Sequence, residues 1–442
     1  MSDVREYEAS EGWGGDVRFV TGYEGFAYRP NEVITGGDQG RDAAQRLFPG
    51  VFPDSIAELV FPETTENVAS GRRYLLRGVI DPIDAVEELR SEGFAAQPNH
   101  VMFVHGGNCC GPHPAQRWQG CLSGSPVYAS PVYASPVYAS PVYASPVYAS
   151  PVYASELHAS GRRRSSAVPT TGLPVARLAG TYPERPVRVA VLDTGMAGDG
   201  YRPAALDAMT PSREHWERPD TDGDLYLDPA AGHGTFIAGL IELVTPGCEI
   251  TVEKVLSSYG EGDEVAIARR VYALAGAVDL INLSFGGYAL ERMNVLAAAV
   301  RRATSAGTVV VASAGNDGTC RPTYPAALPD VVGVGAIGPN GPAPFTNYGA
   351  WVRACAPGVD VVSWFFSEFD GPGVQGPGSI DPDHFENWAR WSGTSFAAPI
   401  VVAALAREMH IYAVDAPGAV RRVIDGPGLL RIPELGTVVN LG

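Results

Sequence analysis

The chain has 442 residues, of which 45% are hydrophobic and 18% are charged, so it is long enough for two or three domains and is not a disordered polymer. Its formal net charge of −17 argues against nucleic acid or an anionic membrane surface as a partner. No run approaches 18 consecutive apolar residues, and the first residues lack the basic and apolar regions of a secretion signal. We therefore expect a cytoplasmic protein without a membrane span, and export by another route stays open.

Residues 1–105 are expected to form a small α+β module. A strand is predicted over 74–80, followed by Asp81 as a helix N-cap and Pro82 at the first helical position. A second strand is predicted over 101–104. The module therefore contains a strand–helix–strand unit.

A connector at 106–125 follows this module and is rich in metal-ligand side chains. The candidates are Cys109, Cys110, His113 and Cys121, together with His105 at the end of the module. Their spacing matches no Cys-x-x-Cys pairing, so a zinc site, a hairpin of buried thiols and, in an exported protein, a disulfide all stay open.

The segment 126–155 consists of six identical Pro-Val-Tyr-Ala-Ser repeats. Proline at every fifth position excludes a helix, and the segment has too little apolar surface to form a core. We interpret it as a linker, with a ladder of six tyrosines for recognition as the alternative. A flexible linker is expected over 156–184, in which Arg162, Arg163 and Arg164 are exposed.

From residue 185 to the end, apolar strands alternate with helical stretches. Strands are predicted over 187–192, 250–256, 278–283 and 308–312. Helices are predicted over 234–243, 264–275 and 293–305. This alternation indicates a parallel sheet with helices on both faces, in which function is located at the carboxyl ends of the strands.

Three polar residues lie at such strand ends or at helix starts. Asp193 ends a buried strand in the motif D-T-G, and His233 begins a helix in the motif G-H-G-T-x-x-A-G. Ser395 lies in the first turn of an apolar helix within the motif G-T-S-x-A-x-P, where Pro399 cannot donate to the Ser395 carbonyl and an irregular turn is expected. Taken singly, each has a structural explanation as a cap or a core residue.

Together, in the order Asp, His, Ser, the three motifs resemble the subtilisin-like serine proteases (the subtilase family, peptidase S8), for which this order is known. The resemblance covers roughly residues 187–409 and implies a subtilisin-like α/β fold in 185–442. It implies a serine endopeptidase with Ser395 as nucleophile, His233 as general base and acid, and Asp193 as the residue that orients the imidazole. The family's oxyanion asparagine matches Asn316.

The resemblance also implies that a polypeptide substrate binds as an added strand along a sheet edge. The matching residues are Ser284, Phe285, Gly286 and Gly287 on one side and Ser313, Ala314, Gly315 and Asp317 on the other. Asp317 would lie near the rim of the first specificity pocket, where an exposed charge favours a basic residue only slightly.

The N-terminal module is similar to the propeptides of the family, which implies that it binds the catalytic domain of its own chain. Arg162 to Arg164 would then be a site of self-cleavage. A permanent targeting module is the alternative if no cleavage occurs.

No cofactor is expected to be required. Alternate carboxylates at Asp220, Asp222, Asp224 and Asp228 resemble those of calcium loops, although Gly223 precedes the third acid and no bidentate Glu closes the loop. A calcium site and a solvated acidic loop both stay open.

Two further features of the catalytic part are ambiguous. Cys320 and Cys355 flank an expected strand pair and would bridge only in an oxidising compartment. The stretch 362–392 is long for the family and is interpreted either as a lid or substrate-selecting wall or as a surface insertion.

Two alternatives to a general endopeptidase are carried forward. One is a dedicated maturation peptidase that cuts a single peptide or protein. The other is a catalytically silent scaffold that binds peptides in the same groove.

Overall fold

A computed structural model describes residues 17–20, 25–56, 72–104, 185–209, 211–289, 293–370 and 385–439. The predictions for the segment 105–125, for the repeats at 126–155 and for Arg162 to Arg164 lie outside these residues.

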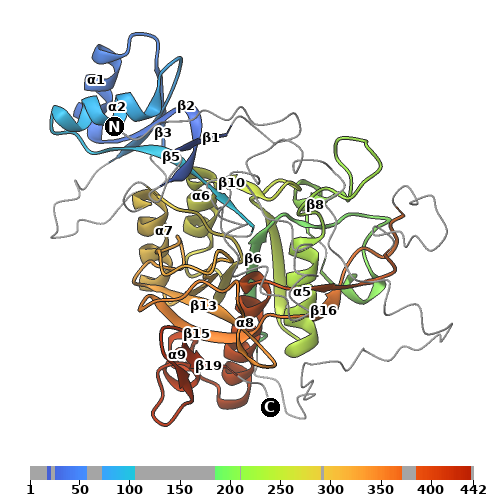
Figure 1. Ribbon diagram of the computed structural model, residues 1–442. Coiled ribbons are helices and arrows are strands. Elements are labelled where there is room, and N and C mark those ends of the chain that lie inside the picture. The colour runs from blue at the N-terminus through green and yellow to red at the C-terminus, as the bar shows by residue number, and fades with distance from the viewer. Residues whose placement is uncertain are drawn as a thin grey trace.

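The N-terminal module is an antiparallel sheet covered by two helices (Figure 1). Its elements are β1 (Arg18–Val20), β2 (Phe26–Gly36), α1 (Gly37–Leu47), β3 (Phe52–Ser55), β4 (Arg73–Arg77), α2 (Pro82–Ser91) and β5 (Ala96–Phe103). The prediction of Asp81 as N-cap is confirmed, because its carboxylate accepts hydrogen bonds from the N–H groups of Ile83 and Asp84. Strand β5 begins five residues before the predicted strand, and β4 ends three residues before its predicted end.

The second part is built on a nine-stranded sheet of order β18-β19-β15-β13-β12-β11-β6-β9, in which β14 pairs with β13 at the side. Its strands are β6 (Arg188–Asp193), β9 (Glu249–Lys254), β11 (Leu280–Leu283), β12 (Val309–Ser313), β13 (Val331–Gly338), β14 (Gly341–Pro342), β15 (Val352–Pro357), β18 (Arg431–Ile432) and β19 (Gly436–Val438). In the order in which they lie in the sheet, the six strands β9, β6, β11, β12, β13 and β15 and the strand β19 pair in parallel, as predicted. The predicted α/β class is therefore confirmed.

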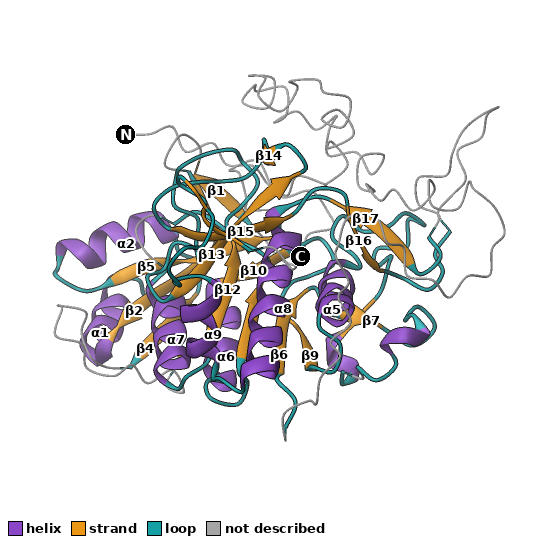
Figure 2. Ribbon diagram, turned by 90° about the horizontal axis from the view of Figure 1, so that it is seen from below, coloured by secondary structure: helices purple, strands orange, loops and turns teal. Residues whose placement is uncertain are grey.

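Helices cover both faces of this sheet (Figures 1 and 2). They are α5 (His233–Val244), α6 (Glu264–Leu274), α7 (Asn294–Ser305), α8 (Thr394–Tyr412) and α9 (Ala416–Val423). Alternate residues of β6 point to opposite faces: Val189 and Val191 belong to the core that contains α5 and α8, whereas Ala190 and Leu192 belong to the core that contains α6 and α7. A strand buried on both faces explains why the sequence of β6 is apolar at every interior position.

Three short strand pairs surround the main sheet. β7 (Met196–Ala197) pairs with β8 (Trp216–Glu217), and β16 (Val361–Trp364) pairs with β17 (Trp388–Trp391). β10 (Glu261–Asp263) pairs with β5 and thereby extends the sheet of the module into the second part of the chain. The sequence did not predict this junction.

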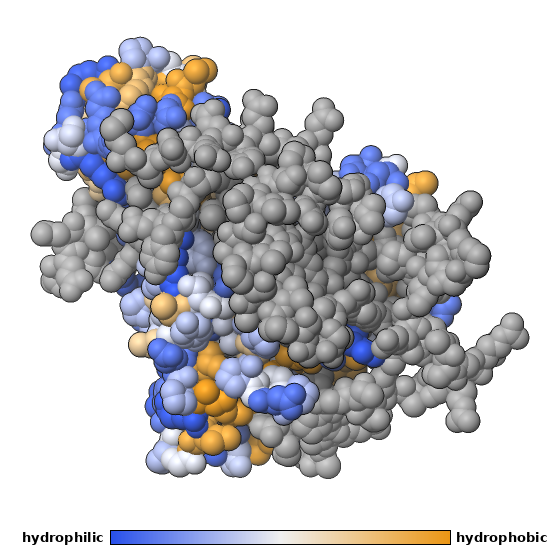
Figure 3. Space-filling model, viewed as in Figure 1, coloured by the Kyte–Doolittle hydropathy of each residue, from blue (hydrophilic) through white to orange (hydrophobic). Residues whose placement is uncertain are grey.

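Hydrophilic and hydrophobic residues are mixed on the part of the module that is visible in Figure 3. Within the described ranges, no single helix is long and apolar enough to cross a membrane, and only α8 and α9 taken together across a 107° bend meet that test.

Candidate active site

Asp193 and His233 form a buried hydrogen-bonded pair. Asp193 is the last residue of β6 and His233 is the first residue of α5, and both side chains are fully buried. His233 Nδ1 lies 2.7 Å from Asp193 Oδ1, which also accepts the N–H of Thr194 at 2.8 Å. Because an ionised carboxylate can only accept, the proton is on Nδ1, and the second ring nitrogen of a neutral imidazole is then basic.

Glycines on both sides of His233 allow neighbouring groups to pack closely against the start of α5. Gly232 has φ +80°, and a Cβ there would lie 2.1 Å from the ring of Phe365. A Cβ on Gly234 would lie 2.1 Å from the carbonyl oxygen of Gly195. The G-H-G motif is therefore required by close packing around the start of α5.

Ser395 is the second residue of α8 and is fully buried. Its Oγ donates to the carbonyl oxygen of Val104 at 2.8 Å and lies 3.1 Å from that of Ser284. The neighbouring ring of Phe396 packs 5.3 Å from the ring of His233, centroid to centroid. The start of α8 therefore lies beside the Asp193–His233 pair, so the fold brings the three predicted residues to one place.

The carbonyl of Ser395 receives a substitute hydrogen bond. Pro399 has no N–H to donate to it, yet α8 runs without a break from Thr394 to Tyr412, so the expectation of an irregular turn is wrong. The hydroxyl of Ser284 donates to this carbonyl at 2.8 Å and itself accepts from the side-chain amide of Asn282 at 2.9 Å. This chain of bonds satisfies the carbonyl and ties α8 to the end of β11.

The side chain of Asn316 is held by Thr394. Its Oδ1 accepts the backbone N–H and the hydroxyl of Thr394, both at 2.9 Å. Because the amide oxygen is fixed by two donors, the NH₂ group is identified and is left as a donor beside the residue that follows Thr394, which is Ser395.

The predicted substrate edge is occupied by the module. Phe103 of β5 exchanges two backbone hydrogen bonds with Gly286, at 2.9 and 2.8 Å. On its other side β5 pairs with β10, and the N–H of Val104 donates to the carbonyl of Gly260 at 2.9 Å. The end of β5 thus lies between β10 on one side and Gly286 on the other. Figure 1 shows β5 running from the module toward β6.

The other predicted substrate residues serve different structural purposes. Phe285 and Ala314 are fully buried in core clusters. A Cβ on Gly287 would lie 2.9 Å from the carbonyl oxygen of Val101, so this glycine allows β5 to approach. Ser313 is the buried end of β12, and the N–H of Gly315 donates to the Thr394 hydroxyl at 3.0 Å.

Asp317 is engaged by neighbouring side chains. The hydroxyl of Tyr288 donates to its Oδ2 at 2.8 Å, and the guanidinium of Arg321 lies 3.9 Å from the centroid of the Tyr288 ring. Burial raises the pKa of Tyr288. Tyr288 in turn packs on Phe26 and Tyr28 of the module. The prediction of a weak preference for basic substrates stays a prediction.

A buried polar contact fixes the module to the rest of the chain. Glu264, at the start of α6, accepts the side-chain amide of Gln97 at 2.8 Å and lies 2.9 Å from His100 Nδ1. Its other oxygen accepts the N–H groups of Val295 and Leu296 in the first turn of α7. The carboxylate therefore joins β5 to two helices with no exposed surface.

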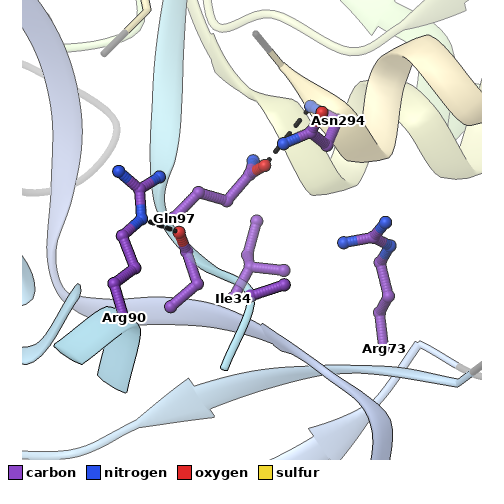
Figure 4. Close-up of a pocket in the computed structure, with 7 residues that line it drawn as sticks. Ile34, Arg73, Arg90, Gln97 and Asn294 are labelled. Atoms are coloured by element: carbon purple, nitrogen blue, oxygen red, sulfur yellow. Dashed lines mark hydrogen bonds between the residues drawn. The ribbon is translucent and has the colours of Figure 1, made fainter. Parts of the chain in front are cut away.

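A cavity of about 130 Å³ lies next to this contact. In Figure 4 the side chain of Gln97 reaches toward the first residue of α7, where the N–H of Asn294 donates to it at 3.3 Å. Arg90 and Arg73 also line the cavity, and Arg90 donates to the carbonyl of Ala96. Burial lowers the pKa of Arg73.

The acidic loop brings together three of its four predicted carboxylates. Asp220, Asp222 and Asp224 offer oxygens within 4.8 Å of one another, whereas the Asp228 carboxylate bonds to the backbone N–H and hydroxyl of Thr221. Burial raises the pKa of Asp228 to about 6. Oxygen ligands suit calcium, but each of the three acids already accepts a backbone N–H of the loop. Calcium binding stays a prediction.

The C-terminal end of the long stretch at 362–392 packs against the ring of His233. The strands β16 and β17 form a hairpin, and Trp391 at its end packs 5.4 Å from the His233 ring at 90°. Phe365 packs edge-on against both Phe385 and Trp391. The described ends of the stretch are thus core structure, and its central residues 371–384 lie outside the description.

The cysteines of the described part are unbridged. Cys320 is exposed, Cys355 is buried in β15, and Cys248 is half-buried. Cys320 and Cys355 are therefore separate thiols in this structure.

Three functional features of the site were not predicted from the sequence: the strand β10, the Glu264 contact, and Thr394 as the partner of Asn316. Only the last had a usable signal, because Thr394 lies inside the G-T-S motif.

Comparison with known proteins places the second part among proteases. The sequence model of the subtilase family, Peptidase S8, matches residues 184–424 of this chain. Subtilisin DY of Bacillus licheniformis is 31% identical over 250 residues, which are 53% of this chain and 81% of the relative. Subtilisin Savinase of Lederbergia lenta is 34% identical over 49% of this chain and 79% of its own. An intracellular serine protease of Paenibacillus polymyxa is 32% identical over 50% of this chain and 66% of its own.

Solved structures with a related arrangement include a cold-adapted subtilisin-like serine proteinase, with a TM-score of 0.45 and 21% identity over 58% of this chain and 89% of that one. A lanthipeptide protease has a TM-score of 0.43 and 23% identity over 58% of this chain and 85% of that one.

Proposed function

Because the chain belongs to the subtilase family of serine proteases, we propose that Asp193, His233 and Ser395 are its catalytic triad and that its own N-terminal module occupies the substrate groove. The proposal is supported by the 2.7 Å contact between Asp193 and His233 and by the position of Ser395 next to them.

In this mechanism, Ser395 Oγ forms a bond to the carbonyl carbon of the substrate while its proton passes to His233 Nε2. The imidazolium is stabilised by Asp193 through Nδ1–H. When the tetrahedral intermediate collapses, the C–N bond breaks and the proton goes from Nε2 to the leaving amine. A water molecule then repeats the sequence on the acyl-enzyme and releases the carboxylic acid.

The negative charge on the substrate oxygen needs donors that are already in place. The Asn316 NH₂ group is such a donor, because Thr394 fixes the amide oxygen on the opposite side. The backbone N–H of Ser395 is the second donor, since the first N–H groups of a helix have no partner within the helix.

The single observation that supports control by the module is the position of β5. Its last residues pair on both sides with backbone edges and bring the Val104 carbonyl to the hydroxyl of Ser395. A polypeptide bound as an added strand uses the same backbone groups. The module therefore excludes other substrates for as long as it stays bound.

Labelling of Ser395 with a fluorophosphonate tests the activity. We expect covalent labelling of the wild-type chain, slow while β5 is in place, and none of Ser395→Ala. Failure to label the wild type after removal of the N-terminal segment would favour the silent peptide-binding scaffold. A library of peptides then separates a general endopeptidase from a dedicated maturation peptidase, because only the latter would cut at a single site.

A further inference from the structure

A second carboxyl group, that of Glu217, is buried close to Asp193. Glu217 is fully buried on β8, which pairs with β7 three residues beyond Asp193. Both of its carboxyl oxygens are inaccessible to solvent and lack a partner at hydrogen-bond distance, although the Thr194 hydroxyl and the Gly232 backbone partly offset the cost of a charge there. An unpaired ionised carboxylate is very costly in such a place, so the neutral acid is the form that fits.

The surroundings of Glu217 link it to the candidate triad. The groups that face its carboxyl are the hydroxyl of Thr194, the backbone of Gly232, the ammonium of Lys254 and the carboxylate of Asp193. Thr194 and Gly232 are the residues next to Asp193 and His233 in the chain. Glu217 thus lies close to the Asp193–His233 pair.

Lys254 is the only lysine of the chain and is the register partner of Asp193 on β9. The charge of its ammonium acts on Glu217 and lowers the pKa of that carboxyl group. The titratable groups that face Glu217 are therefore Asp193 from β6 and Lys254 from β9, with His233 of α5 acting through Asp193.

Asp193 also has an oxygen in need of a donor. Its Oδ1 accepts two hydrogen bonds, but its buried Oδ2 accepts none. Two carboxyl groups in one dry region do not both ionise readily, and one of them retains a proton. Only Asp193 is bonded to the imidazole, so Glu217 is the carboxyl group that keeps the proton.

We propose that Glu217 is a positioning residue of the active site, which acts on the imidazole of His233 through Asp193. This inference rests on the proposed function of the triad. Burial raises the pKa of Glu217 to about 8, and Lys254 opposes that shift. At a pH below this pKa, Glu217 is neutral and adds no charge to that of Asp193.

The ionised form stabilises the imidazolium of His233. A second negative charge beside Asp193 raises the basicity of the imidazole, and the transition state contains the protonated ring. The activity of the wild type should therefore rise in two steps with pH, the first for His233 and the second for Glu217. A glutamine at position 217 has nearly the same shape but cannot ionise, so it removes only the second step.

The test compares the full-length wild type with Glu217→Gln and with Glu242→Gln. Glu242 lies on the same helix as His233, its pKa is also raised by burial, and it faces Gly247 rather than the triad. For kcat/KM on a peptide substrate, we expect Glu217→Gln to equal the wild type within twofold at pH 6.5 and to be about three- to tenfold lower at pH 9.5. Glu242→Gln should follow the wild type at both values.

A second measurement does not depend on turnover. The Nδ1 proton of His233 is bonded to Asp193, and its proton resonance should titrate in two steps in the wild type and in one step in Glu217→Gln. An equal loss of kcat/KM at every pH, or the same titration in both proteins, would overturn the proposal. If the bound module keeps every full-length variant from turning over a peptide, the resonance alone decides the role of Glu217. The proposed triad function fails only if Ser395 is not labelled by a fluorophosphonate after the module is removed.

Discussion

The hydroxyl of Ser395 donates a hydrogen bond to the main-chain carbonyl oxygen of Val104, 2.8 Å away and 291 residues earlier in the chain. The carbonyl belongs to the residue that follows β5, so the contact joins the end of the N-terminal module to the candidate nucleophile. The module thus ends in the groove where a substrate is expected to bind.

The first prediction is self-cleavage just beyond β5. Backbone pairing holds Phe103 and Val104 at the entrance of the site, and the chain continues directly from there. We expect the wild type to be cut at Val104–His105 or His105–Gly106, and Ser395→Ala to stay intact. Intact-mass measurement and sequencing of the new N-terminus are the tests.

The arginines at 162–164 are the alternative cleavage site that the sequence suggested. A new N-terminus within 163–165 would favour that site and would count against cleavage at the end of β5. Identical intact chains of the wild type and Ser395→Ala would argue for a permanently attached module.

The second prediction concerns Asn316. Replacement by alanine removes the NH₂ donor and also the oxygen that accepts twice from Thr394. We expect kcat to fall by about 10²- to 10³-fold with little change in KM, which is the loss measured when the corresponding donor of subtilisin is removed. Asn316→Asp, which keeps the acceptor but has no NH₂ group, is the informative comparison.

Steady-state kinetics on a peptide substrate provide the measurement. If Asn316→Asp retains the wild-type kcat while Asn316→Ala does not, the residue holds Thr394 in place and does not bind the developing charge.

The strands of the second part and the three motif residues could be predicted because their signals are local. Val189 to Leu192 are apolar at every position, and this pattern is typical of a strand buried on both faces. Asp193 ends such a strand, at the edge where a parallel sheet collects its polar residues, and His233 begins a helix. The distance between Asp193 and His233 could not be predicted from the sequence and is known only from the structure.

The attachment of the module could not be predicted, because its partners lie far apart in the chain. Gln97 and His100 meet Glu264 across more than 160 residues, and nothing in the local sequence of β5 marks that partner. The replacement of the missing Pro399 donor by Ser284 is a contact of the same kind. Such pairings depend on the three-dimensional fold, and periodicity does not encode them.

The third prediction concerns the contact at Glu264. Glu264→Gln places an amide NH₂ against the two donors from Gln97 and His100, so buried donors are left without an acceptor. We expect the free energy of unfolding to fall by about 1–3 kcal/mol. Urea denaturation measures this change, and the exposed Glu87→Gln on α2 is the control, for which no loss is expected.

The same variant should loosen β5, so labelling of Ser395 by a fluorophosphonate should become faster than in the wild type. Unchanged stability together with unchanged labelling would show that Glu264 does not hold the module.

The fourth prediction concerns the thiols of the described part. Burial raises the pKa of Cys248 and of Cys355 to about 12, whereas Cys320 is exposed. At pH 8 only about one in 10⁴ of the buried thiols is ionised, and the thiolate is the reactive form. We therefore expect iodoacetamide to modify Cys320 in the native protein, while Cys248 and Cys355 react only after denaturation in urea. Peptide mapping by mass spectrometry follows each site separately, and modification of Cys355 as fast as Cys320 would contradict the burial of β15 that the structure describes.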